Sequence, residues 1–178
     1  MLFRSGVSNH NLGEIRLADQ ILGESRFRVE AVQNHYSLLY RCSERAGILE
    51  YCREHDVRFF SYMVLEQGAL TGRYSPADPL PEGSSRAAVY NGILPRLQAL
   101  TDRMGAIGED RGASAADVAT AWAIAKGTTP IVGVTKAGYI DGLVRARGIE
   151  LAEEETAELE TLADAADVDT RGWWEQEM

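Results

Sequence analysis

Short apolar segments alternate four times with longer helical segments, and this alternation constrains the fold more than any other feature. The apolar segments are expected to be strands, and they end near Val7, Gln33, Tyr62 and Gly133. Strands that alternate with helices favour right-handed crossovers and a parallel sheet. The sequence therefore predicts an α/β protein with four strand–helix units, whereas a closed (β/α) barrel requires eight.

Amphipathic periodicity predicts helices over residues 12–22, 43–55, 90–111, 114–126, 139–147 and 153–165. Two local signals support these boundaries: Pro95 falls in a first turn, and Ser114 with Asp117 resembles a capping box. The region from 65 to 86 is expected to be a long loop. The aromatic tail, residues 171–175, is expected to pack on the rest of the protein.

Composition narrows the classes of function. The chain has 178 residues, which suits a single domain over 1–178, and a net charge of −9, which disfavours nucleic acid as a partner. Its two cysteines and three histidines have no metal-site spacing, so no metal site is expected. We find no signal peptide or membrane span in the sequence, and a reducing cytoplasm is the expected location.

Polar residues follow the predicted strands at the edge where ligands gather in parallel α/β folds. Ser8 and Asn9 offer a hydroxyl and an amide that suit a carboxamide, although the same pair is common in turns and helix caps. Gln33 has the same capacity. Tyr62 is suited either to stacking on an aromatic ligand or to core packing.

Two further segments are suited to phosphate. The loop at 67–72 carries Gly68 and Gly72, which allow close approach of backbone N–H groups. Thr135 and Lys136 precede a predicted helix start. Each signal is weak in isolation, because glycine loops and exposed lysines are common.

Taken together and in order, these runs resemble the C-terminal half of an aldo/keto reductase. The matching runs are Gly6-Val7-Ser8-Asn9-His10, Val32-Gln33-Asn34-His35-Tyr36-Ser37-Leu38-Leu39, the stretch 61–74, Ala116-Asp117-Val118-Ala119-Thr120-Ala121-Trp122, and Pro130-Ile131-Val132-Gly133-Val134-Thr135-Lys136. The resemblance implies a (β/α)8 TIM-barrel type of fold. This chain would contribute the fifth to eighth strands with a C-terminal helix and tail, and the N-terminal half of the barrel would be missing.

The resemblance also implies a binding site for NADP(H), with NAD(H) as an alternative. By this resemblance, the nicotinamide carboxamide would be bound by Ser8, Asn9 and Gln33, and the nicotinamide ring would stack on Tyr62. The pyrophosphate and ribose would be contacted by Leu65, Gln67, Gly68 and Thr71. The adenosine 2′-phosphate would be contacted by Gly133, Thr135 and Lys136. The chain departs from the family at Tyr139, Gly142 and Leu143, where adenosine-gripping side chains are usual. Tyr139 is a candidate to stack on the adenine instead.

The family's catalytic Tyr, Lys, Asp and His belong to the missing half, so no catalytic residue is assigned here. Two interpretations remain open. The chain is the cofactor-binding portion of a reductase of aldehydes and ketones, inactive alone, or it is a non-catalytic half-barrel that binds a dinucleotide or a protein partner.

A half-barrel leaves strand edges and an inner face uncovered, which costs stability. We place Val7, Val29, Ala31, Phe59 and Ile131 on that inner face. A homo-oligomer, a complementing N-terminal half-barrel, or a soft, aggregation-prone monomer is therefore expected.

Overall fold

The structure is a computed structural model that describes residues 5–172 and Glu175. Its centre is a parallel sheet in which four strands lie side by side in chain order. The strands are β1 Ser5–Ser8, β2 Val29–His35, β3 Arg58–Tyr62 and β4 Thr129–Pro130. The prediction of a parallel α/β fold with four strand units is confirmed.

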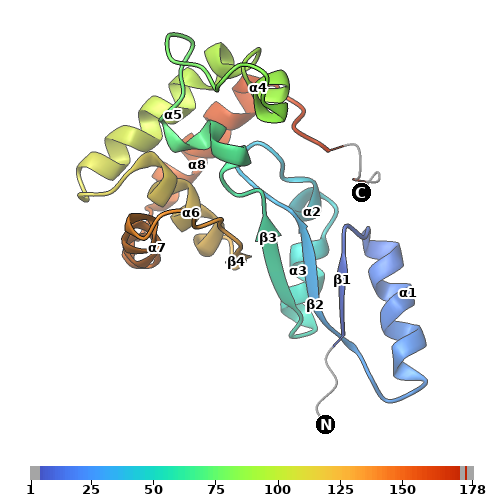
Figure 1. The fold of residues 1–178 in the computed structure, drawn as a ribbon. Coiled ribbons are helices and arrows are strands. Elements are labelled where there is room, and N and C mark those ends of the chain that lie inside the picture. Colours follow the sequence, from blue (N-terminus) through green and yellow to red (C-terminus); the bar gives the residue numbers. More distant parts are fainter. Residues whose placement is uncertain (1–4, 173–174, 176–178) are drawn as a thin grey trace.

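Helices follow each strand and pack mainly on one face of the sheet (Figure 1). They are α1 Leu12–Gly23, α2 Cys42–Arg45, α3 Ile48–Glu54, the 3-10 helix η1 Glu66–Thr71, α4 Ser85–Tyr90, α5 Leu94–Glu109, α6 Ala115–Ala125, α7 Gly138–Gly148 and α8 Glu153–Ala166. Among the described residues, no helix is long and apolar enough to cross a membrane.

Two predicted helices differ in the structure: one is divided and one begins later than expected. The segment 43–55 breaks into α2 and α3 because Gly47 adopts a φ of 77°, outside the right-handed helical region. The segment 90–111 is preceded by the separate helix α4, and a turn at 91–93 redirects the chain into α5. The predicted fourth strand is also shorter than expected, since only Thr129 and Pro130 pair with β3.

The local helix signals behave as expected. The Ser114 hydroxyl accepts from the Asp117 backbone N–H at 3.2 Å, and the Asp117 carboxylate accepts from the Ser114 N–H at 3.0 Å. This reciprocal pair satisfies two of the otherwise unpaired N–H groups at the start of α6. Pro95 lies in the first turn of α5, where its missing N–H costs nothing.

The main core lies between the sheet and its helices. Val32 and Phe59 are partners in the ladder between β2 and β3, and both are buried. Trp122 of α6 stacks on Tyr36 with ring centroids 5.2 Å apart, and both rings are fully buried.

The assignment of inner-face residues was wrong for three of the five. Val7 and Phe59 pack in the core on the helix side, because the register pairs Val7 with Val32 and Val32 with Phe59. Val29 lies in the same core although it is three positions from Val32, because a register shift between Ser5 and Gly6 interrupts the alternation. Successive side chains of a strand point to opposite faces. The uncovered face therefore carries their neighbours instead.

Candidate functional site

The carboxyl ends of β1 and β2 bring three predicted site residues together. Ser8 and Gln33 are register partners, and both side chains are exposed on the face that the helices leave uncovered. Asn9 follows with a φ of 57°, a left-handed conformation that asparagine tolerates. Its N–H donates to the Gln33 carbonyl at 3.0 Å, which fixes the end of β1 against β2.

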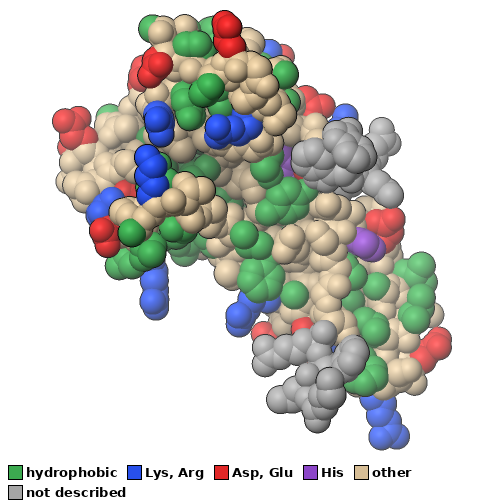
Figure 2. Space-filling view, viewed as in Figure 1, with side chains coloured by type: hydrophobic (Ala, Val, Ile, Leu, Met, Phe, Trp, Pro, Cys, Tyr) green, Lys and Arg blue, Asp and Glu red, His purple; other side chains and the backbone are tan. Residues whose placement is uncertain are grey.

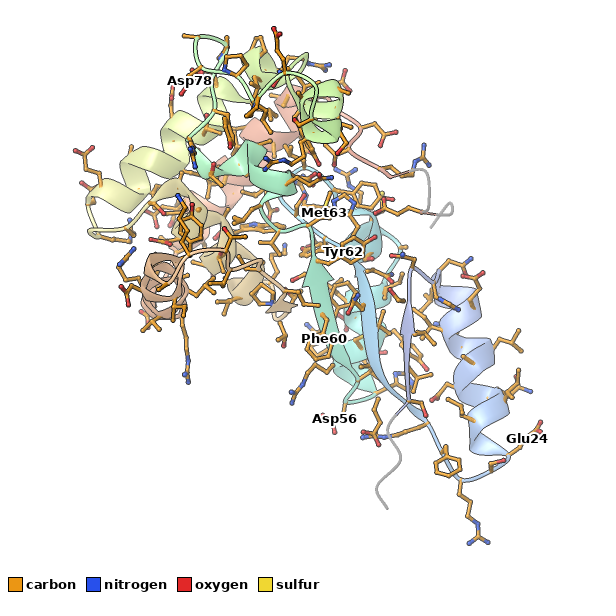
Figure 3. All side chains as sticks on the ribbon, viewed as in Figure 1. Glu24, Asp56, Phe60, Tyr62, Met63 and Asp78 are labelled. Carbon is orange, nitrogen blue, oxygen red and sulfur yellow. The ribbon has the colours of Figure 1, made fainter. Side chains whose placement is uncertain are left out.

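Tyr62 completes this group from the end of β3. It pairs in register with His35, and Figure 3 shows it at the end of the strand, beyond Phe60. Its hydroxyl lies 2.7 Å from Asn9 Oδ1 and 2.6 Å from Glu175 Oε1. We call Ser8, Asn9, Gln33 and Tyr62 the strand-tip group.

A buried charged cluster lies directly beside the strand-tip group. His35 Nε2 lies 2.8 Å from Glu66 Oε1, and His35 Nδ1 lies 2.9 Å from Glu175 Oε1. The side chains of His35 and Glu66 are fully buried, and that of Glu175 nearly so. The Tyr40 ring stacks on the imidazole at 4.3 Å, and the Tyr62 ring is tilted against it at 5.5 Å.

Glu66 receives several further hydrogen bonds. The hydroxyls of Tyr90 and Thr170 donate to it at 2.8 and 3.1 Å, and Ser37 also donates. Burial and the adjacent Glu66 carboxylate raise the pKa of Tyr90. These donors, together with His35, satisfy the oxygens of the buried Glu66 carboxylate.

The cluster favours a charged imidazole. Burial acts to lower the pKa of His35, but hydrogen bonds to Glu175 and Glu66 outweigh it and raise this pKa to about 9. Burial acts to raise the pKa of Glu175, but its bonds to His35 and Tyr62 lower it overall. Because both ring nitrogens of the charged His35 donate hydrogen bonds, neither is available to bind a metal ion. Among the described residues, no group of three or more His, Cys, Asp and Glu side chains is placed to hold a metal ion.

The predicted phosphate loop, residues 67–72, lies after β3 and is tightly fixed. Gln67 and Gly68 have φ values of 51° and 110°. Thr71 Oγ1 donates to the Gly68 carbonyl at 2.6 Å, and Arg86 donates to the Gln67 carbonyl at 3.1 Å. The Gly68 N–H is bonded to the carbonyl of half-buried Leu65, so any phosphate contact must come from other groups of the loop.

The predicted adenosine-binding residues lie on a separate, exposed segment after β4. Gly133, Thr135, Lys136 and Tyr139 are all exposed. The Tyr139 N–H donates to the Lys136 carbonyl at 3.0 Å, a local turn at the start of α7. The structure itself does not join this segment to the strand-tip group.

A hollow of about 450 Å³ also borders the phosphate loop, between Thr71 and helix α5. Asp102 and Glu109 lie in its wall. Carboxylates repel phosphate, so this hollow is not where we place the cofactor.

Sequence reasoning missed His35, Glu66 and Glu175. The histidines were considered as metal ligands only, and Glu66 lies between two residues that were singled out. The expectation that the tail packs on the protein is confirmed for Glu175, while Trp173 and Trp174 lie outside the described residues. A histidine two positions after Gln33, on the same strand face, was the available signal.

With this geometry in place, comparison with known proteins defines the class. The sequence profile of the aldo/keto reductase family matches residues 4–164, so the chain belongs to that family. It is 33% identical over 158 residues to the chloroplastic pyridoxal reductase of Arabidopsis thaliana, covering 89% of this chain and 43% of the relative. It is also 33% identical over 138 residues to the aldo-keto reductase dtxS3 of Metarhizium robertsii, and this match covers 74% of this chain and 36% of the relative.

Solved structures agree on the fold. The glycerol dehydrogenase AKR11B4 of Gluconobacter oxydans superposes with a TM-score of 0.76, and the thermostable aldo-keto reductase Tm1743 with 0.64, each at 23% identity. Each match covers 89% of this chain and 48% of the solved chain. The fold is therefore of the TIM-barrel type, and the chain spans less than half the length of these relatives.

Proposed function

We propose that this chain is the cofactor-binding portion of an NADP(H)-dependent oxidoreductase that reduces aldehydes or ketones. The observation that carries the proposal is the strand-tip group: exposed Ser8 and Gln33 lie side by side, and Asn9, held by its N–H to the Gln33 carbonyl, lies next to the Tyr62 hydroxyl. A nicotinamide carboxamide has one acceptor and two donor positions, and hydroxyl and amide side chains match both. The half-buried Tyr62 ring then lies beneath the nicotinamide.

Bound NADPH supplies the hydride, and the protein's task is to hold the reacting carbon in place. Leu65, Gln67, Gly68 and Thr71 lie just after β3, in a fixed loop suited to line the pyrophosphate and ribose. Rigid positioning of this kind lowers the entropic cost of reaching the reactive geometry.

We assign the adenosine end to Gly133, Thr135, Lys136 and Tyr139. The exposed Lys136 offers a cation for the 2′-phosphate, which favours NADP(H) over NAD(H). Lys136→Met should then weaken NADPH binding several-fold and leave NADH binding unchanged, as measured by fluorescence titration. Equal loss for both cofactors would contradict the assignment.

Carbonyl reduction also requires a proton donor, which we assign to a complementing N-terminal half-barrel. Two observations support such a partner: the sheet face bearing Ser8 and Gln33 is uncovered, and α1 exposes Leu17 and Ile21 to 56% and 57%. Figure 2 shows hydrophobic side chains exposed on the viewed face, over the regions of α1 and of the sheet. Burying such surface stabilises an assembly by about 25 cal/mol per Å².

The free thiols of Cys42 and Cys52 support a reducing compartment such as the cytoplasm for this function. Burial raises the pKa of Cys52 to about 11, which keeps its thiol protonated and unreactive.

The test is titration of the full chain with NADPH, followed by a carbonyl-reduction assay with and without an N-terminal half-barrel of the family. The proposal predicts saturable binding by the chain and turnover only in the mixture. Absence of saturable binding in both samples would overturn it.

A further inference from the structure

The C-terminal tail turns back onto the sheet at Glu175. The Glu175 N–H donates to the Gly172 carbonyl at 3.0 Å, and the Gly172 N–H donates to Glu175 Oε2 at 3.0 Å. Thr170, upstream of this turn, is buried and donates to Glu66. The turn thus directs the Glu175 carboxylate toward the ends of β2 and β3, and only 9% of the residue is exposed.

This carboxylate connects the buried cluster to the strand-tip group. On one side it accepts from His35 Nδ1 at 2.9 Å, and on the other it accepts from the Tyr62 hydroxyl at 2.6 Å. The Tyr62 hydroxyl has a single proton, and Asn9 Oδ1 lies 2.7 Å from it on the other side. A charged acceptor holds a hydroxyl more strongly than an amide does, so Glu175 has the firmer grip on Tyr62.

A hydrogen bond at the hydroxyl restricts the orientation of the Tyr62 ring, because the hydroxyl is at the end of the side chain. The residue is half-buried, and its ring is tilted against His35 with ring centroids 5.5 Å apart. A side chain that keeps rotamer freedom loses it when a ligand stacks on it, and that loss weakens binding. A fixed hydroxyl removes this cost beforehand.

We propose that Glu175 is a positioning residue of the cofactor site: the tail carboxylate, held by His35, fixes the Tyr62 ring in the orientation that receives the nicotinamide. This inference rests on the function proposed above and adds a part of the chain that it did not include. It assigns the tail to cofactor affinity and not merely to fold stability.

The groups that face His35 set the conditions under which the tail is held. They are Glu66 from η1, Glu175 from the tail, Tyr40 from the segment after β2, and Tyr62 from β3. The tail is therefore expected to be held at neutral pH, where the imidazole is charged and the Glu175 carboxylate is ionised.

Glu175→Gln tests the inference without a change in size. We expect NADPH to bind about tenfold more weakly, the size of one lost charge-assisted hydrogen bond. Binding of 2′,5′-ADP, which lacks the nicotinamide, should change less than about twofold on the same scale. Asp169→Asn is the matched control, because Asp169 belongs to the same tail but its carboxylate contacts exposed Arg171.

Tyr62→Phe supplies a second variant, which keeps the ring and removes the hydroxyl. If Glu175 acts through that hydroxyl, the double variant binds NADPH no more weakly than Tyr62→Phe alone. Additive losses would overturn the inference, as would equal weakening of NADPH and 2′,5′-ADP in Glu175→Gln, or no change in either.

Hydrogen exchange of the tail, measured by mass spectrometry, gives a readout independent of cofactor. The backbone amides of Thr170 and Gly172 should exchange faster in Glu175→Gln than in the wild type and Asp169→Asn. Unchanged exchange would show that Glu175 does not hold the tail. If the wild type fails to bind NADPH, the proposed function falls, and exchange still decides whether Glu175 fixes the tail.

Discussion

The two faces of the sheet differ in what their side chains do, although they belong to the same strands. On the helix side, Val32 and Phe59 are buried in the main core. On the opposite face, their immediate neighbours Gln33 and Arg58 are exposed. A strand with a period of two can thus supply stability from one set of residues and binding groups from the other.

The two faces also differ in what they contribute: one contributes mainly to the free energy of folding, and the other to ligand binding. The helix-side face buries large apolar rings, which dominate folding free energy. The uncovered face ends in the exposed polar side chains of Ser8 and Gln33 at the strand tips. Substitutions on the two faces should therefore have opposite signatures: loss of stability on one, loss of binding on the other.

The largest effect is expected from Trp122→Ala on the helix side. Trp122 is fully buried, stacks on Tyr36 and donates to Glu160 at 3.0 Å. Its removal should lower the free energy of unfolding by about 3–5 kcal/mol. Chemical denaturation measures this, and a loss below about 1 kcal/mol would contradict the assignment of the core.

The pH dependence of stability is expected to be the next largest effect. The folded-state pKa of His35, about 9, lies above its ordinary value of 6.5, so charging the imidazole stabilises the fold. This contribution is complete below pH 6.5 and is lost as the pH rises through 9, a change of about 3 kcal/mol. Glu175 has a lowered pKa, so its contribution is present above the ordinary carboxyl range and lost in acid.

Denaturation curves of the wild type and His35→Gln between pH 5 and pH 10 check this expectation. The difference in stability between the two proteins should shrink as the pH rises toward 10. A difference that stays constant would show that His35 is not held charged between Glu66 and Glu175.

The substitution Gln33→Ala should have a smaller effect than these, and it should weaken NADPH binding without lowering stability. Losing one hydrogen bond to the carboxamide should weaken NADPH binding about threefold to tenfold. Stability should change by less than about 0.5 kcal/mol, because the side chain is exposed. Arg58→Ala, on the same face but at the start of β3, is the control and should leave NADPH binding unchanged.

The smallest effect on stability is expected from a substitution on the exposed side of α1. Leu17→Ala should change monomer stability by less than about 0.5 kcal/mol, while Ile15→Ala, two positions earlier and fully buried, should cost about 2–5 kcal/mol. If sizing shows an oligomer that Leu17→Ala dissociates, the exposed side of α1 is an interface.

The sequence predicted the parts of this molecule that depend on local pattern. The strand ends near Val7 and Tyr62 were predicted from short apolar runs with polar ends, and the cap at Ser114 from spacing. The strand predicted to end near Gln33 continues to His35. The break at Gly47 was missed because a helical period continues across it, while only the left-handed conformation of the glycine interrupts the helix.

Long-range contacts were beyond such reasoning. His35 and Glu175 are 140 residues apart, and no local pattern pairs them. The faces of Val7 and Phe59 were also missed, because a one-residue choice of register inverts every side chain of a strand. The roles given to the strand-tip group and to Lys136 remain predictions.

The most direct test of the strand-tip site is the NMR response of side-chain amide groups to NADPH. The account predicts that the NH₂ signals of Asn9 and Gln33 shift in a saturable manner, while those of Asn34, buried on the helix side, and Asn91, bonded to Leu80, stay in place. Saturable binding without a shift at Asn9 or Gln33 would contradict the claim that the strand tips hold the nicotinamide.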